Sequence, residues 1–398
     1  GQTSNQAIEP YATMGELKQV PYNFGSTNSY GFMVKVLPNY NLGWEFTENY
    51  NAGLDFGIFN GRITGYVDFY YQKTKDVLVQ VKLPVTSGVD GRMWQNVGST
   101  ENKGLEFSVS AQIIKPKEQG SFGWDVDFNI YANRNKLVAL NSGVPYDTDN
   151  GFFPGHPINV IYDYVKLGII QEKEAPYFGY KAGVIKVQDV SGKEGIPDGQ
   201  ISADYDKKIL GSFEPDFSGG FSTRFAYKNF DLSVVSFFKS GGMLVSTIHM
   251  PQSYLNTNNA RRNTIKVDYW TPANPSGKYP QPGNQATADQ NDFGNTLGYF
   301  DASFLKVRTI TLGYTFDPKL LSFIGGKTAR LYFTCQNPFT LFSPYMDEGG
   351  LDPEATGTGA QAASSGLAAG SGIQARQLTI GSNTPPTRNF IVGLNVKF

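Results

Sequence analysis

The chain has 398 residues, of which 40% are hydrophobic and 17% are charged, and its formal net charge is −1. This balance gives no electrostatic basis for binding nucleic acid, and no apolar run approaches the roughly 20 residues that a membrane-spanning helix needs. Aromatic residues make up 14% of the chain and glycine contributes 45 residues, a composition typical of β structure with many turns.

Alternation of apolar and polar side chains predicts about nine strands along the chain. In the first, Phe46 and Leu54 fall on one face while Thr47 and Asp55 fall on the other, and Asn60-Gly61 then predicts a hairpin. The predicted strands lie at 44–59, 62–80, 103–114, 124–140, 216–227, 230–244, 303–317, 328–341 and 390–398.

The strand at 303–317 changes parity along its length. Ile310 and Leu312 share one face, whereas Leu305 and Val307 in the first half fall on the opposite parity. This change predicts a β-bulge or an exit of the strand from a bilayer.

The connections between these strands alternate in length. Those at 60–61, 115–123, 228–229 and 318–327 are short, and those at about 81–102, 141–215, 245–302 and 342–389 are long. Short turns on one side and long loops on the other are typical of a transmembrane antiparallel up-and-down β-barrel with extracellular loops. On this interpretation residues 1–43 form an extracellular loop and the entry to the barrel, and residues 44–398 form barrel strands with their loops.

The last strand supports the same fold class. Phe390, Val392, Leu394 and Val396 share one face, and the chain stops on Phe398. Nine strands do not match the even strand number of bacterial single-chain barrels, and an open edge in lipid would leave backbone groups unpaired. We therefore expect this all-β chain to supply the C-terminal part of a larger barrel.

Several segments together resemble one known family, the SusC/RagA type of TonB-dependent outer-membrane transporter of Bacteroidota. They run in order along the chain: LGWE at 42–45, NAGLDFG at 51–57, YYQKTKDVL at 70–78, NVG at 96–98, NKGLE at 102–106, SFLKVR at 303–308, TLGY at 311–314, QNPFT at 336–340 and LDPE at 351–354. Such proteins have a barrel of about 22 strands, a plug that blocks the lumen, and a TonB box that draws energy from the inner membrane.

The resemblance implies active import of oligomeric nutrients, glycan or peptide, beneath a SusD-like surface lipoprotein that acts as a lid. The expected location is the outer membrane of a Gram-negative bacterium, in contact with its lipid. The sequence begins Gly-Gln-Thr-Ser and shows no plug or TonB box. The plug, the TonB contact and the remaining strands are therefore expected from segments outside it.

An acidic stretch in the second long loop is similar to a calcium-binding loop of this family. Its candidate ligands are Asp189, Ser191, Asp198, Asp204 and Asp206. Spaced carboxylates suit a hard cation such as Ca²⁺, but the inserted residues 192–197 lengthen the first half of the motif. A degenerate Ca²⁺ site and a solvated acidic turn both remain open.

Aromatic residues in the long loops are better candidates for a functional site than the acidic stretch, because sugars and peptides both stack against aromatic faces. The wider set also includes Tyr162, Tyr164, Phe178, Tyr180, Tyr269 and Tyr279. The candidate ligand-binding residues are Trp94, Phe152, Phe153, Tyr177, Tyr254, Trp270 and Tyr299. The alternative role for these rings is to pack the loops together or against the lid.

No catalytic residues are predicted, since the chain has two histidines and one cysteine and lacks a zinc or nucleophile pattern. Two alternatives to an importer remain. One is a passive channel or structural barrel in the same membrane. The other is a soluble glycan-binding β protein, which would bury Phe217, Phe221 and Phe225.

Overall fold

A computed structural model describes residues 13–82, 85–89, 92–96, 98–118, 120–140, 145–148, 151–175, 181–250, 267–281, 293–321, 326–354, 379–380 and 386–398. Its largest element is one antiparallel sheet of nine strands. Their order in the sheet, β20-β18-β17-β14-β13-β8-β7-β4-β3, is the reverse of their order in the chain. The nine strands are β3 (Phe46–Ile58), β4 (Ile63–Lys75), β7 (Gly98–Ile114), β8 (Gly123–Leu140), β13 (Phe217–Tyr227), β14 (Phe230–Ser240), β17 (Phe304–Thr315), β18 (Thr328–Leu341) and β20 (Asn389–Lys397).

This topology confirms the predicted up-and-down fold class. Each strand pairs with its sequence neighbour among the nine, and among the described residues β3 and β20 form the two ends of an open sheet. No helix in the described ranges has the length and apolarity to cross a bilayer.

The short turns have the backbone that their sequences predict. Asn60 and Gly61 both adopt positive φ (58° and 78°) between β3 and β4, as hairpin turns with Asn-Gly require. Lys228 (φ 52°) turns β13 into β14, where Tyr227 pairs with Phe230.

The chain divides into two compact units: residues 1–52, 69–104 and 134–158 form one, and residues 53–68, 105–133 and 159–398 form the other. The first unit includes a hairpin of β1 (Glu16–Phe24) with β2 (Thr27–Val36). It also includes β5 (Leu78–Lys82) paired with β6 (Arg92–Asn96), and the 3₁₀ turn η1 (Val85–Ser87).

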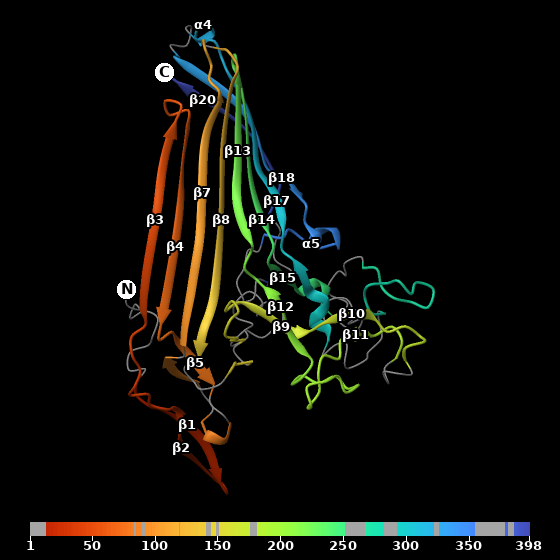
Figure 1. Ribbon diagram of the computed structural model, residues 1–398. Helices are drawn as coiled ribbons and strands as arrows, with labels where there is room; N and C mark the ends of the chain where they lie inside the picture. The colour runs from red at the N-terminus through yellow and green to blue at the C-terminus, as the bar shows by residue number, and fades with distance from the viewer. Residues whose placement is uncertain are drawn as a thin grey trace. The chain divides into compact units, whose positions relative to one another are not determined.

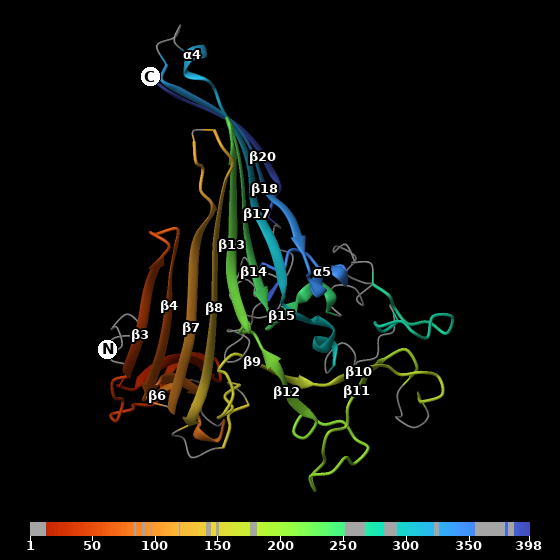
Figure 2. The same cartoon turned by 45° about the horizontal axis from the view of Figure 1, so that its top comes forward.

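The second unit carries most of the long-loop structure. In both views, α4 (Pro318–Leu321) lies at one end of β13, β14 and β17, whereas β9, β12, β15 and α5 gather at the other end (Figures 1 and 2). The loop elements are β9 (Val160–Tyr164), β10 (Lys166–Ile169), β11 (Ile185–Val187), β12 (Lys207–Ser212), β15 (Met243–Ser246), η2 (Thr247–His249), η4 (Gly294–Gly298), β16 (Tyr299–Asp301), α5 (Pro344–Asp347) and β19 (Thr379–Ile380). The separation of long loops from a short turn agrees with the alternation in connection length.

Side chains on the two faces of the second unit's sheet differ as a membrane wall requires. Phe221, Leu312, Phe333 and Leu394 are exposed (38%, 47%, 44% and 59%), although burying such side chains normally contributes about 1.5–3 kcal/mol each. The soluble alternative predicted that Phe217, Phe221 and Phe225 are buried. Phe217 and Phe221 are exposed, and Phe225 is half-buried.

The opposite face carries polar pairs between neighbouring strands. Ser222 donates to Asp127 (Oγ–Oδ2 2.8 Å). Arg330 of β18 donates through two nitrogens to Asp231 of β14 (3.0 and 2.6 Å), reaching across Gly313 of β17, whose missing side chain leaves the space. Polar groups paired across strands fit a hydrated lumen.

The parity change in β17 is a bulge, as predicted. Val235 pairs with Thr309, but the next residue, Ser236, pairs with Val307, so Arg308 is the extra residue. Asn337 of β18, which adopts φ 52°, lies at the matching irregularity on the other side. Arg308 therefore shifts Lys306 onto the face that Thr309 and Thr311 occupy farther along.

Three strands differ most from their predicted bounds: two were predicted too long and one too short. The strand predicted at 62–80 ends at Lys75, because Asp76 has φ 56° and the chain leaves the sheet. The strand predicted at 230–244 ends at Ser240, where Gly241 and Gly242 both have positive φ. The strand predicted at 103–114 was too short. Strand pairing in β7 begins at Gly98, before the apolar alternation that was used to predict the strand.

Candidate functional site

The long loops of the second unit pack into an ordered assembly with its own apolar core. One cluster joins Tyr164 of β9, Ile185 of β11, Tyr279, Phe293 and Leu297 of η4. A second cluster joins Ile161 of β9 and Val245 of β15 with Phe213, which directly follows β12, and Met250, which directly follows η2. A surface built this way can hold a pocket in a fixed shape.

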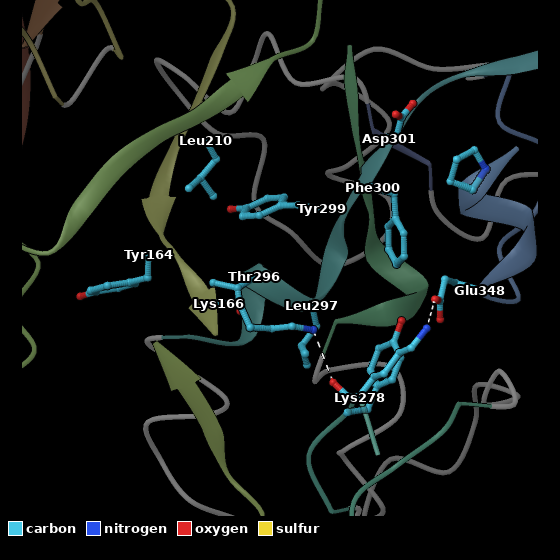
Figure 3. A pocket seen from close by; sticks show the side chains of 12 residues that line it. Tyr164, Lys166, Leu210, Lys278, Thr296, Leu297, Tyr299, Phe300, Asp301 and Glu348 are labelled. Atoms are coloured by element: carbon cyan, nitrogen blue, oxygen red, sulfur yellow. Dashed lines mark hydrogen bonds and ion pairs between the residues drawn. The ribbon is translucent and has the colours of Figure 1, made fainter. Parts of the chain in front are cut away.

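A cavity of about 420 Å³ opens in this assembly (Figure 3). Apolar and aromatic side chains form most of its wall, with four charged residues among them. Its lining consists of Tyr164, Lys166, Leu210, Lys278, Tyr279, Thr296, Leu297, Tyr299, Phe300, Asp301, Pro344 and Glu348. An apolar cavity with a few convergent polar groups is the usual form of a binding site for a small ligand.

Two lysines and one glutamate meet at one side of this cavity. Lys278 donates to the carboxylate of Glu348 (Nζ–Oε1 2.5 Å), and this hydrogen bond raises the pKa of Lys278. Lys166 donates to the backbone oxygen of Lys278 (3.4 Å) and lies over the ring of Tyr279, 5.3 Å from its centroid (Figure 3). Burial lowers the pKa of Lys166, because a desolvated ammonium is costly.

Tyr299 is fixed by a hydrogen bond at the opposite side. Its hydroxyl donates to Asp163 (Oη–Oδ2 2.6 Å), and Lys207 lies 3.6 Å from the other oxygen of that carboxylate. Burial raises the pKa of Tyr299 well above its usual value, so the phenol stays protonated and its ring orientation is set.

Next to the cavity, His249 connects two of the long loops, 245–302 and 342–389. Its Nε2 lies 3.1 Å from the carbonyl oxygen of Glu348, which can only accept, so Nε2 carries the proton. Nδ1 therefore accepts from Ser246 (2.7 Å), whose oxygen lies 3.2 Å from the Tyr345 hydroxyl. His249, Ser246 and Tyr345 are each 0% exposed, so this network supports the loops rather than presenting a nucleophile.

The described candidate aromatics occupy different environments. Tyr299 lines the cavity, and so do Tyr164 and Tyr279 from the wider set. Trp270 is 3% exposed, and its indole nitrogen donates to Gln171 (2.9 Å). Trp270 in that position therefore packs the loop internally, which is the alternative role expected for these rings.

The remaining candidates lie elsewhere or outside the described residues. Phe152 and Phe153 are buried in the first unit, and Trp94 is half-buried there with its backbone oxygen accepting from Asn39 (2.7 Å). Tyr177 and Tyr254 fall outside the described ranges. Their contact with ligand stays a prediction.

The acidic stretch folds into a turn held by backbone hydrogen bonds. Asp206 accepts from the amides of Val190 and Ser191 (2.7 and 3.3 Å) and, through its other oxygen, from Ser202 (2.7 Å). Asp189 accepts from Gly199 (2.7 Å).

The other two acidic candidates have local backbone contacts. Asp198 accepts from the amide of Gln200 (2.9 Å), and the amide of Asp204 donates to Ser202 (3.1 Å). The described residues contain no group of three or more side chains placed to hold a metal ion. The Ca²⁺ site stays a prediction.

Sequence reasoning missed the three charged groups Lys166, Lys278 and Glu348. Lys166 and Lys278 are 112 residues apart, and Lys278 and Glu348 are 70 apart. Charged residues in a long loop carry no local pattern that would predict their meeting.

Comparison with known proteins gives consistent results. The family model for the β-barrel of TonB-dependent receptor-like proteins matches residues 6–338. TonB-dependent receptor P3 of Formosa agariphila is 30% identical over 417 residues, covering 100% of this chain and 38% of that protein. TonB-dependent receptor SusC of Bacteroides thetaiotaomicron is 33% identical over 407 residues, covering 98% of this chain and 35% of that protein.

Two solved structures share the fold. The RagAB peptide transporter gives a TM-score of 0.72 at 23% identity, covering 100% of this chain and 40% of that one. The RagAB peptide importer in its open-open state gives a TM-score of 0.71 at 23% identity, covering 100% of this chain and 39% of that one. The chain thus spans less than two fifths of the length of these curated relatives.

Proposed function

This chain belongs to the β-barrel family of TonB-dependent receptors, and we propose that it forms the C-terminal wall and outer vestibule of an energised nutrient importer. The strands are those of an outer-membrane barrel of the Bacteroidota. One structural observation carries the proposal. An open up-and-down sheet with an exposed apolar face bears, at its long-loop end, an ordered cavity lined by aromatic rings.

The cargo proposed is an oligomeric nutrient, glycan or peptide. Aromatic walls such as Tyr299 and Phe300 suit either class. A solved relative of the same fold is a peptide transporter, which supports the peptide arm of the proposal.

The partners proposed are TonB, which would engage segments outside this sequence, and a SusD-like lipoprotein lid over the long loops. The relatives named TonB-dependent receptors support the first, and the SusC relative supports the second. The open edges of the sheet also require the remaining strands of the barrel, because an edge in lipid leaves backbone groups unsatisfied.

Uptake by whole cells tests this function. Cells that express the full-length protein carrying this chain should take up fluorescent oligosaccharides or oligopeptides, and uptake should stop when TonB is deleted or the proton gradient is collapsed. Uptake that survives loss of TonB would instead identify a passive channel. Co-purification of a surface lipoprotein with the tagged protein tests the lid.

A further inference from the structure

Lys166 is a cation of the cavity described above that forms no ion pair with any described residue. Lys278 and Glu348 neutralise each other, and Lys207 stands beside Asp163 behind Tyr299. Lys166 donates to a backbone oxygen at 3.4 Å, and no carboxylate of the described residues lies within ion-pair distance of its Nζ.

Desolvation makes this arrangement unfavourable in the empty cavity. An ammonium that is partly withdrawn from water loses hydration, and a neutral carbonyl and an aromatic face replace it only in part. The lowered pKa of Lys166 reflects this loss. One monovalent anion beside Lys166 would pair with its ammonium and accept the hydrogen bonds that the ammonium lacks.

Three other polar lining groups have internal partners. Tyr299 donates to Asp163, and Thr296 donates to the carbonyl of Phe293 (2.7 Å). Asp301 accepts from the amide of Ser303 (2.7 Å). These three groups are therefore less available to the hydroxyls of a sugar ring, and each buried hydroxyl without a partner is costly.

The rest of the wall suits an apolar side chain. Leu210, Leu297, Phe300 and Pro344 line the same cavity as Lys166. A group with a single negative charge directly beside an apolar side chain matches this wall, and the carboxyl terminus of a peptide ending in an apolar residue has that chemistry.

We propose that this cavity binds the free carboxyl terminus of an imported peptide, with Lys166 pairing with its carboxylate and Leu210, Leu297 and Phe300 receiving its last side chain. The ion pair of Glu348 with Lys278 leaves Lys166 as the group that selects for one negative charge. This assignment rests on the proposed import function and names the cargo class of its vestibule.

Binding of small peptides to the purified full-length protein, with any co-purifying lipoprotein retained, tests the assignment. The probes are Ala-Ala-Leu with a free carboxyl terminus and the same peptide as its amide, measured by titration calorimetry. We expect the acid to bind about tenfold more tightly than the amide. Lys166→Met should abolish this preference and Lys166→Arg should retain it.

The matched control is Lys208→Met. Lys208 is an exposed lysine of β12 that does not line the cavity, so its loss removes the same charge from the loops while the preference persists. The heat-induced gel shift of each variant checks that the barrel has folded.

Three results would overturn the assignment: equal binding of acid and amide, a preference that survives Lys166→Met, or binding of neither peptide. Tighter binding of digalacturonate than of the peptide acid would also overturn it and assign the cavity to an acidic sugar. The TonB-dependent uptake assay measures energised import, and the calorimetric titration measures the preference for a free carboxylate. Failure of one proposal can therefore be told apart from failure of the other.

Discussion

Replacing Lys306 by methionine removes a buried cation that connects the barrel wall to the loops. Lys306 of β17 is 1% exposed, and its ammonium donates to Asp352 (2.8 Å) and Glu354 (3.0 Å). Methionine keeps most of the side chain's volume and apolar stem, so the change removes charge and hydrogen bonds with little loss of packing.

The magnitude follows from the exposure of the three partners. Breaking a fully buried ion pair by removing one member costs about 3–5 kcal/mol. The side chains of Asp352 and Glu354 are 15% and 31% exposed, and Arg308 also pairs with Glu354. Water and Arg308 offset part of the loss, so we expect about 2–4 kcal/mol.

The affected structure is the segment 343–354, which we call the strap. Its local opening should become about 30-fold to about 700-fold more frequent in Lys306→Met, because each 1.4 kcal/mol is a factor of ten. Hydrogen exchange of strap amides in the full-length protein measures this change. Strap exchange within about twofold of the unsubstituted protein would refute the reasoning.

A matched control separates the buried charge from an exposed one on the same strand. Arg308 pairs with Glu354, but its side chain is 40% exposed. Arg308→Gln should therefore cost less than about 1 kcal/mol. An effect as large as that of Lys306→Met would mean that burial does not set the strength of this contact.

Three further changes test the wall and the loop core. Phe221→Arg on the apolar face should cost about 2–4 kcal/mol and reduce barrel assembly in heat-shift gels, whereas Ser222→Arg on the polar face should assemble normally; equal assembly would contradict the assignment of faces. Gly313→Val should lower the midpoint of the heat shift by displacing the side chain of Arg330, and the loss should shrink in an Arg330→Ala background. Burial holds the pKa of His249 below its usual 6.5. The stabilisation from its neutral form is therefore present above pH 6.5 and is lost as the pH falls below that value. Hydrogen exchange of η2 amides, corrected for intrinsic rates, should become faster as the pH is lowered from about 7 to about 5, and it should not become faster in His249→Gln.

The sheet could be predicted from sequence because its signals are local. Alternation marks each strand, Asn60-Gly61 marks a turn, and the parity of Leu305 and Val307 indicates the bulge at Arg308. Strand ends were less accurate, since apolar alternation continues past Lys75 although Asp76 breaks the pairing. The hairpin of β1 and β2 was missed because a general loop was expected over 1–43.

The loop assembly could not be predicted because its contacts are distant in sequence and its strands lack alternation. β9 has four of its five residues buried, so no polar face marks it as a strand. Its partner is β12, where Ile209 pairs with Tyr162, and β15 pairs in parallel with β19, where Val245 pairs with Thr379. The aromatic residues of the long loops predicted a ligand-binding surface, but nothing in the sequence indicated that Lys166 would lie in it.

The strap links the cavity to the barrel wall through consecutive contacts. At one end Glu348 holds Lys278 beside the cavity and accepts from His249 through its backbone. At the other end Asp352 and Glu354 pair with Lys306 of β17. A peptide carboxylate bound beside Lys166, as proposed above, would change the electrostatic environment of Glu348, a few residues from the buried pairs on the strand. Loosening the strap at Lys306 should therefore weaken binding of the peptide acid in the calorimetric titration as well as raise exchange of the strap amides.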